Sequence, residues 1–258
     1  MPAPTESSFI TVRGHNLEYQ RYPGREPNAP TIVLLHEGLG SVSMWRDFPK
    51  RVADATGSPV VVYSRYGYGK SDVLQAPFTV RYMHEEALEA LPEFLDRLEI
   101  EAPVLLGHSD GGSIALIHAG AFGRAQALIL ESPHVFVEDI SVKSIAEAKV
   151  IFETTDLAKK LARYHADTQK TFRGWNDIWL HPDFRGWNIE EYLPRIECPV
   201  LAIQGRNDEY GTMAQMEAIQ RQVRGPVELL KLEHCGHSPH RDQPAAVLEA
   251  VWEFVAGL

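Results

Sequence analysis

Short apolar runs alternate with stretches of helical periodicity along most of the chain, and this alternation constrains the fold more than any other feature. Each run is short, rich in Val, Ile and Leu, and bounded by turn residues, which is typical of a strand buried on both faces. The runs are TIVLLH (31–36), PVVVYSR (59–65), PVLLGH (103–108), ALILES (127–132) and PVLAIQG (199–205). Buried strands separated by helices form a parallel sheet that helices cover on both sides. The sequence therefore predicts an α/β fold with a mostly parallel, twisted sheet.

Both ends of the chain extend this pattern. FITVRG (9–14) and NLEYQRY (16–22) predict a hairpin that turns at Gly14, and PVELLKLEH (226–234) predicts the last strand. Helices are expected near 44–54, over about 80–98, and over the closing segment 244–258. The apolar residues of the closing segment fall on one helical face: Val247, Leu248, Val251, Phe254 and Val255.

One long segment interrupts the alternation. From Val137 to Arg195 there is no strong strand, but there are helix-like stretches and three tryptophans, Trp175, Trp179 and Trp187. We expect an inserted helical lid at 137–195, and a core domain formed by 1–136 and 196–258. The alternative is a pair of ordinary helices packed on the sheet.

Composition restricts the partners and the location of the protein. With 258 residues, 44% of them hydrophobic, the chain can bury the core of one large domain. Its 25 basic and 35 acidic residues give a net charge of −10, which argues against binding to nucleic acid or an anionic membrane. No secretory signal is visible, and no apolar stretch reaches the ~20 residues that a membrane span needs. We therefore expect a soluble, cytoplasmic protein.

A serine between two glycines follows one of the apolar runs. Gly107-His108-Ser109-Asp110-Gly111 matches the pattern G-x-S-x-G, and a helical repeat of apolar residues begins at Ile114. In this pattern a strained strand-to-helix turn exposes the serine hydroxyl, and the flanking glycines relieve crowding. A free serine hydroxyl is a poor nucleophile at pH 7, so acyl transfer also needs a histidine base and a carboxylate.

Candidates for both partners follow later strands. Asp208 comes just after the run that ends at Gly205, and His237 comes just after the last predicted strand. The carboxyl ends of parallel strands meet at one edge of a sheet, so we expect these side chains to converge on Ser109. Glu209 is the alternative acid, and His234 and His240 are the alternative bases.

Two other motifs resemble sites of different function. His234, Cys235, His237 and His240 could bind zinc, but such a site would leave Ser109 without its base, so no metal is predicted. YGYGKSD (66–72) lacks the first glycine of a phosphate-binding loop, because Ser64 stands five residues before Gly69. Nucleotide binding is not expected.

The order Ser109, Asp208, His237 resembles that of the α/β-hydrolase superfamily, in the lidded group that holds esterases, lactonases, haloalkane dehalogenases and carbon–carbon bond hydrolases. The resemblance covers about residue 30 to the C-terminus and implies a sheet of about eight strands. It also implies that Ser109 is the nucleophile, that His237 is the base and that Asp208 orients His237.

The resemblance further implies an oxyanion hole formed by the N–H groups of Asp110 and Gly38, with Leu39 as the alternative to Gly38. Relatives usually carry His-Gly where this chain has His36-Glu37. The Glu37 carboxylate is interpreted as structural, bonded to the loop backbone, or else as a pocket group that shifts a nearby pKa.

The Asp110 carboxylate is interpreted as solvated or as facing the helix dipole, and its alternative role is recognition of a substrate ammonium or hydroxyl group. His134, Trp175 and Trp179 are candidates for substrate contact, although the tryptophans could instead form the core of the lid.

Serine at the elbow, where dehalogenases carry aspartate, indicates a carbonyl substrate. The predicted activity is cleavage of a small carboxylic ester, thioester, lactone or amide through an acyl-enzyme, without a cofactor. A non-catalytic small-molecule receptor, an acyltransferase and a carbon–carbon bond hydrolase are the alternatives.

Overall fold

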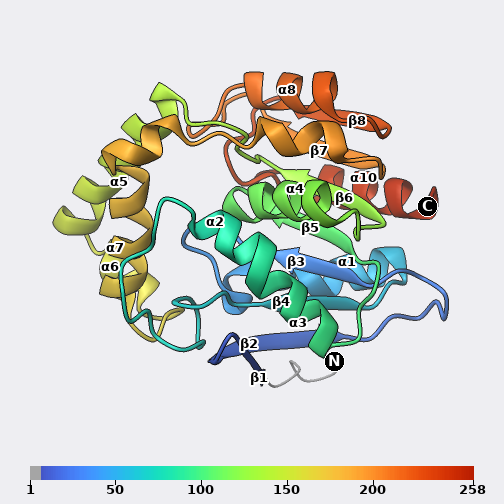
Figure 1. Cartoon of the computed structure of the whole chain (residues 1–258), viewed down its shortest axis with the longest axis horizontal. Helices are drawn as coiled ribbons and strands as arrows, with labels where there is room; N and C mark the ends of the chain where they lie inside the picture. Colours follow the sequence, from blue (N-terminus) through green and yellow to red (C-terminus); the bar gives the residue numbers. More distant parts are fainter. Residues whose placement is uncertain (1–6) are drawn as a thin grey trace.

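The strand order of the sheet places the predicted apolar runs side by side at its centre (Figure 1). The computed structural model describes residues 7–258, and within them eight strands form one sheet in the order β1-β2-β4-β3-β5-β6-β7-β8. In chain order they are β1 (Ser8–Val12), β2 (His15–Tyr22), β3 (Ile32–Leu35), β4 (Val60–Tyr63), β5 (Val104–His108), β6 (Ala127–Glu131), β7 (Val200–Gly205) and β8 (Val227–Leu232). β2 is antiparallel to β1 and β4, and every pairing from β4 to β8 is parallel. The predicted fold class is confirmed.

Alternate residues of each central strand pack into two separate apolar layers. In β3, Val33 and Leu35 pack into the layer that contains α3 (Leu91–Arg97), α4 (Asp110–Phe122) and α8 (Ala214–Gln222). Ile32 and Leu34 pack into the layer of α1 (Phe48–Thr56) and α10 (Pro244–Ala256) on the other face. All four side chains are fully buried. Burial on both faces explains why the strand is a continuous apolar run and shows no alternation.

The helix expected over about 80–98 is present but is not uniform. It consists of α2 (Tyr82–Glu85), one π-helical segment η2 (Glu86–Ala90) and α3. Pro92 lies in the first turn of α3, where it has no N–H to donate to the preceding turn. A wider π turn before such a position adjusts the helix around the missing hydrogen bond.

The helices of the predicted insertion lie between β6 and β7. They are α5 (Asp139–Thr154), α6 (Leu157–Leu161), α7 (Thr168–Trp179), and the 3-10 helices η3 (Pro182–Gly186) and η4 (Glu190–Arg195). α5, α6 and α7 form a group to one side of the sheet (Figure 1), whereas η4 packs against α4 of the core. The segment therefore has two parts with different packing.

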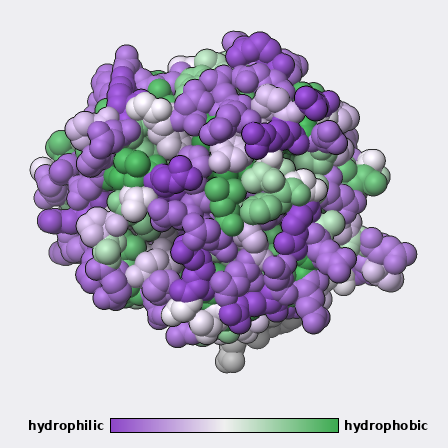
Figure 2. All heavy atoms as spheres, viewed as in Figure 1, coloured by the Kyte–Doolittle hydropathy of each residue, from purple (hydrophilic) through white to green (hydrophobic). Residues whose placement is uncertain are grey.

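The face of the molecule drawn in Figure 2 is mostly hydrophilic. The face in Figure 2 shows apolar side chains only in small separate patches among polar ones. Among residues 7–258, no helix has the length and apolar character needed to cross a membrane.

Candidate active site

Ser109 lies on the sharp turn between β5 and α4, with φ 54° and ψ −118°. This is a strained conformation for a residue with a side chain. The neighbouring glycines are required by close backbone contacts: a Cβ atom on Gly111 would lie 2.0 Å from the carbonyl oxygen of Leu35, and one on Gly107 would lie 2.3 Å from that of Gly111. The Ser109 N–H donates to the carbonyl of Glu131 at the end of β6, at 2.8 Å. Tight packing therefore holds the serine in its strained turn.

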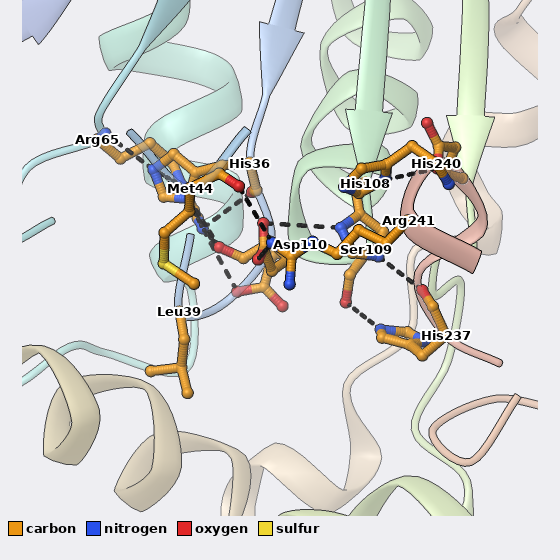
Figure 3. A network of polar contacts seen from close by, with 12 residues as sticks. His36, Leu39, Met44, Arg65, His108, Ser109, Asp110, His237, His240 and Arg241 are labelled. Carbon is orange, nitrogen blue, oxygen red and sulfur yellow. Dashed lines mark hydrogen bonds and ion pairs between the residues drawn. The ribbon is translucent and has the colours of Figure 1, made fainter. Parts of the chain in front are cut away.

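The structure brings His237 and Asp208 together with Ser109. His237 Nε2 lies 2.9 Å from Ser109 Oγ, and His237 Nδ1 lies 2.8 Å from Asp208 Oδ1 (Figure 3 shows the first contact). Asp208 Oδ1 also accepts hydrogen bonds from the N–H groups of Tyr210 and Gly211. The three side chains form one hydrogen-bonded path that runs from a hydroxyl through an imidazole to a carboxylate.

The environment of Asp208 keeps its carboxylate charged. Burial raises the pKa of Asp208, but the charge and hydrogen bond of His237, with the Tyr210 N–H, outweigh burial and leave this pKa below its ordinary value. An ionised carboxylate at this position fixes the His237 tautomer with hydrogen on Nδ1 and stabilises a protonated imidazole.

The alternative partners named from the sequence occupy other positions. The Glu209 carboxylate accepts from the backbone N–H of His237 at 3.2 Å, so it does not contact the imidazole. His240 Nδ1 contacts Glu131 Oε2 at 2.9 Å, and His234 is exposed. Over residues 7–258, no group of three or more His, Cys, Asp or Glu side chains has the arrangement of a metal site.

Gly38, Leu39 and Asp110 all line the cavity that contains Ser109. Asp110 is the first residue of α4, so its N–H has no acceptor within the helix. Within residues 7–258, the N–H groups of Gly38 and Leu39 form no hydrogen bond to a backbone carbonyl or to a side chain. These amides are therefore available to a ligand oxygen.

The Asp110 side chain is fully buried, so its interpretation as a solvated carboxylate is wrong. Its Oδ2 accepts from the Tyr82 hydroxyl at 2.7 Å and lies 3.8 Å from Arg65 Nη2. The Trp179 indole in turn donates to the Tyr82 hydroxyl at 2.9 Å. Burial raises the pKa of Asp110 in spite of the nearby guanidinium.

The Glu37 carboxylate fits the second of its two interpretations, because it lines the cavity of Ser109 and raises the pKa of His108. It accepts from Arg241 Nη2 at 3.2 Å and lies 3.6 Å from His108 Nδ1, so it is bonded to side chains and not to the loop backbone. Burial raises the pKa of Glu37, but His108 and Arg241 together hold it well below the ordinary value.

The three residues predicted to contact substrate, His134, Trp175 and Trp179, all line the cavity that contains Ser109. The volume of this cavity is about 200 Å³. Trp175 covers Gly38 so closely that a Cβ atom there would lie 2.0 Å from the indole nitrogen. Burial, followed by the charge of His237, lowers the pKa of His134 to about 3. The remaining tryptophan of the predicted insertion, Trp187, stacks on Phe184 with ring centroids 5.5 Å apart and packs into the hydrophobic core.

Comparison with known proteins decides the family. Residues 32–250 match the model of the alpha/beta hydrolase family. The chain belongs to this family. It is 24% identical to the proline iminopeptidase of Saccharolobus solfataricus, over 97% of this chain and 92% of that protein. It is 26% identical to the human serine hydrolase BPHL, over 85% of this chain and 76% of that protein.

The solved structures agree in fold. The enol-lactonase from Burkholderia xenovorans superposes with a TM-score of 0.75 at 20% identity, and the match covers 96% of this chain and all of the lactonase. Membership of the family identifies the chain as an enzyme of the hydrolase class.

Arg65 and Tyr82 also belong to the site of this hydrolase, but neither was predicted from the sequence. Arg65 is 2% exposed and donates from Nη2 to the backbone carbonyl of Glu37 at 2.9 Å, which supports the loop that carries Gly38. The signal for Arg65 was its position two residues after a fully buried strand, where a charged side chain has to find partners. Tyr82 gave no signal, because it reads as one more apolar residue of its helix.

Proposed function

We propose that this protein is a serine hydrolase that cleaves a small carboxylic ester, or a related thioester, lactone or amide, through an acyl-enzyme. The observation that carries the proposal is the continuous hydrogen-bonded path from Ser109 through His237 to Asp208. The relative named serine hydrolase BPHL is consistent with such a mechanism.

In the first half of the reaction, Ser109 Oγ bonds to the acyl carbon while its proton moves to His237 Nε2. The carbonyl oxygen becomes an oxyanion, which accepts hydrogen bonds from the N–H groups of Asp110 and of Gly38 or Leu39. The bond to the leaving oxygen then breaks, and His237 gives its proton to that oxygen. Asp208 stays ionised and stabilises the protonated His237.

In the second half, a water molecule replaces the departed alcohol. His237 takes one proton from the water as its oxygen bonds to the acyl carbon, and then returns that proton to Ser109 Oγ as the acid leaves. The proposal invokes no cofactor, because the chain's own groups move every proton and stabilise the oxyanion.

The cavity favours a small, uncharged acyl group. Its walls are mostly apolar or aromatic: Leu39, Met44, Ile145, Leu161, Trp175 and Trp179. The charged side chains beside the cavity are already paired: Asp110 with Arg65, Asp208 with His237, and Glu37 with Arg241. A charged acyl group would therefore be buried without a partner of opposite charge. Trp175 and Trp179 belong to α7, and we propose that α5–α7 act as a lid over the substrate. A cytoplasmic location remains a prediction from the sequence.

The test combines a fluorophosphonate probe with p-nitrophenyl esters of acetate, butyrate and succinate. Ser109→Ala should abolish labelling and lower kcat by about 10⁶-fold if the three side chains act as a unit. The matched control is Ser43→Ala, because Ser43 is exposed, and this substitution should change neither the labelling nor kcat. Butyrate should be cleaved faster than the anionic succinate ester.

A loss of only a few fold in Ser109→Ala would refute the assignment of the nucleophile. Product analysis with added alcohol and thiol acceptors separates hydrolysis from acyl transfer. If the main product is an ester formed with the added alcohol, the activity is acyl transfer and not hydrolysis.

A further inference from the structure

We infer that His108 and Glu37 form a second histidine–carboxylate pair, which acts as a positioning device for His237. The inference rests on the proposed function, because it concerns the residue to which that function assigns the base. His108 directly precedes Ser109, and its side chain reaches across to the loop of His237 (Figure 3). The two imidazole ring centroids are 5.3 Å apart.

The contact between the two residues fixes the main chain of the base. His108 Nε2 lies 2.7 Å from the backbone carbonyl oxygen of His237. A carbonyl oxygen only accepts hydrogen bonds, so His108 Nε2 carries a proton and donates it. This hydrogen bond joins the residue before the nucleophile to the residue that carries the base, across 129 positions of the sequence.

Glu37 completes the pair from the other side of the ring. Its Oε2 lies 3.6 Å from His108 Nδ1, and His108 is 1% exposed. At this distance Glu37 makes a charge contact with Nδ1 and not a hydrogen bond, and a carboxylate so placed favours the protonated, charged form of the imidazole. Burial lowers the pKa of His108, but the nearby Glu37 carboxylate outweighs burial and raises this pKa above its ordinary value.

Glu37 also fixes a second point of the same loop region. Its Oε1 accepts from Arg241, which lies in the short helix α9 (Pro239–Asp242) directly after the His237 loop. His108 therefore holds the carbonyl of His237, and Glu37 holds both His108 and Arg241.

This arrangement gives His108 a role in the rate of reaction apart from its role in stability. The His237 imidazole must stay within hydrogen-bond reach of both Ser109 Oγ and Asp208 Oδ1, and displacements of about 1 Å at a reacting group can lower a rate about 100-fold. Substrate does not contact the carbonyl of His237 in the proposed mechanism, so the loss should fall on kcat and leave KM nearly unchanged.

The experiment compares His108→Leu, which removes the Nε2 donor and the ring that faces Glu37, with His108→Gln, whose amide can still donate to the His237 carbonyl. His108→Leu should lower kcat and the rate of fluorophosphonate labelling by about 30-fold, with KM changed less than threefold. His108→Gln should recover at least a third of the wild-type kcat.

The matched control is His118→Leu, because His118 is also fully buried and contacts one backbone carbonyl, that of Ala87, at 3.0 Å. Its substitution should cost stability but leave kcat within twofold. All rates are measured at a temperature where denaturation curves show every variant to be folded.

A second readout does not depend on turnover. The proton shared by His237 Nδ1 and Asp208 should give a far-downfield proton NMR signal, which should weaken or shift in His108→Leu and persist in His108→Gln. Equal kcat losses in His108→Leu and His108→Gln, or no loss in His108→Leu, would overturn the inference. Failure of Ser109 to be labelled would refute the proposed function, whereas the NMR comparison would still test the positioning of His237.

Discussion

His134 should make the folded protein sensitive to mild acid, and the size of this effect can be worked out from its environment. Burial lowers the pKa of His134 to about 3, whereas an unfolded chain has a histidine pKa of about 6.5. Between these two values the unfolded chain binds a proton that the folded protein does not bind. Lowering the pH through this window therefore favours unfolding.

Linkage gives the magnitude. With pKa values of about 6.5 and about 3, His134 should reduce the free energy of unfolding by about 2 kcal/mol between pH 7 and pH 5. Because pH 5 lies well above the folded pKa, this figure depends almost entirely on the unfolded value. The effect is large compared with the stability of a typical domain, about 5–15 kcal/mol.

His134→Phe should remove this acid sensitivity. Within residues 7–258 the His134 imidazole makes no hydrogen bond, and it packs edge-on against Trp179 at 5.0 Å between ring centroids, so phenylalanine keeps the aromatic contact. The measurement is urea denaturation at pH 7 and pH 5 for the wild type and the variant.

The loss on acidification should be about 2 kcal/mol smaller in His134→Phe. The control is His234→Asn, an exposed histidine with φ 52°, a backbone conformation that asparagine tolerates. His234→Asn should lose as much stability as the wild type when the pH is lowered from 7 to 5. Equal losses in the wild type and His134→Phe would show that His134 can be protonated in the folded state, and would refute the reasoning.

Two further substitutions test the turn and the acid. Gly111→Ala should destabilise the protein by about 3 kcal/mol, because its Cβ atom would lie 2.0 Å from the Leu35 carbonyl oxygen. The control is Gly186→Ala, where no atom lies within 4 Å of the added carbon, and it should change stability by less than about 0.5 kcal/mol. Urea denaturation measures both, and a nearly neutral Gly111→Ala would show that the turn can relax. Asp208→Asn should lower kcat for p-nitrophenyl butyrate by about 10⁴-fold, because the amide favours the wrong His237 tautomer. A kcat within tenfold of the wild type would assign the acid to another residue.

The sequence was sufficient to predict the sheet and the residues that follow its strands. The apolar runs form strands because few other structures bury Val, Ile and Leu on two faces at once. Ser109 and Asp208 could be named because each follows such a run, and His237 because it follows the last predicted strand, since parallel strands end at a common edge. Their proximity is thus a consequence of the topology, although their catalytic roles stay a proposal.

The side-chain partners within the site could not be predicted in the same way. Asp110 bonds to Tyr82, and Glu37 bonds to Arg241, which is 204 residues away. Neither pair shares a helix face or neighbouring strands, so no periodicity links its members. The expectation of a solvated Asp110 was wrong for this reason, because the strand-and-helix pattern does not show whether a side chain at the start of α4 turns inward.

Glu131 shows how the fold and the site depend on the same residues. It ends β6, and its carbonyl accepts the Ser109 N–H, while its carboxylate accepts the backbone N–H of His240 at 2.9 Å and also contacts the His240 ring. Burial raises the pKa of Glu131, but His240 outweighs burial and keeps this pKa below the ordinary value, so the carboxylate stays charged. One buried strand end therefore supports the nucleophile turn through its backbone and the helix after His237 through its side chain. Sheet register and site geometry are coupled at this point, because a shift of β6 along β5 would move both supports together.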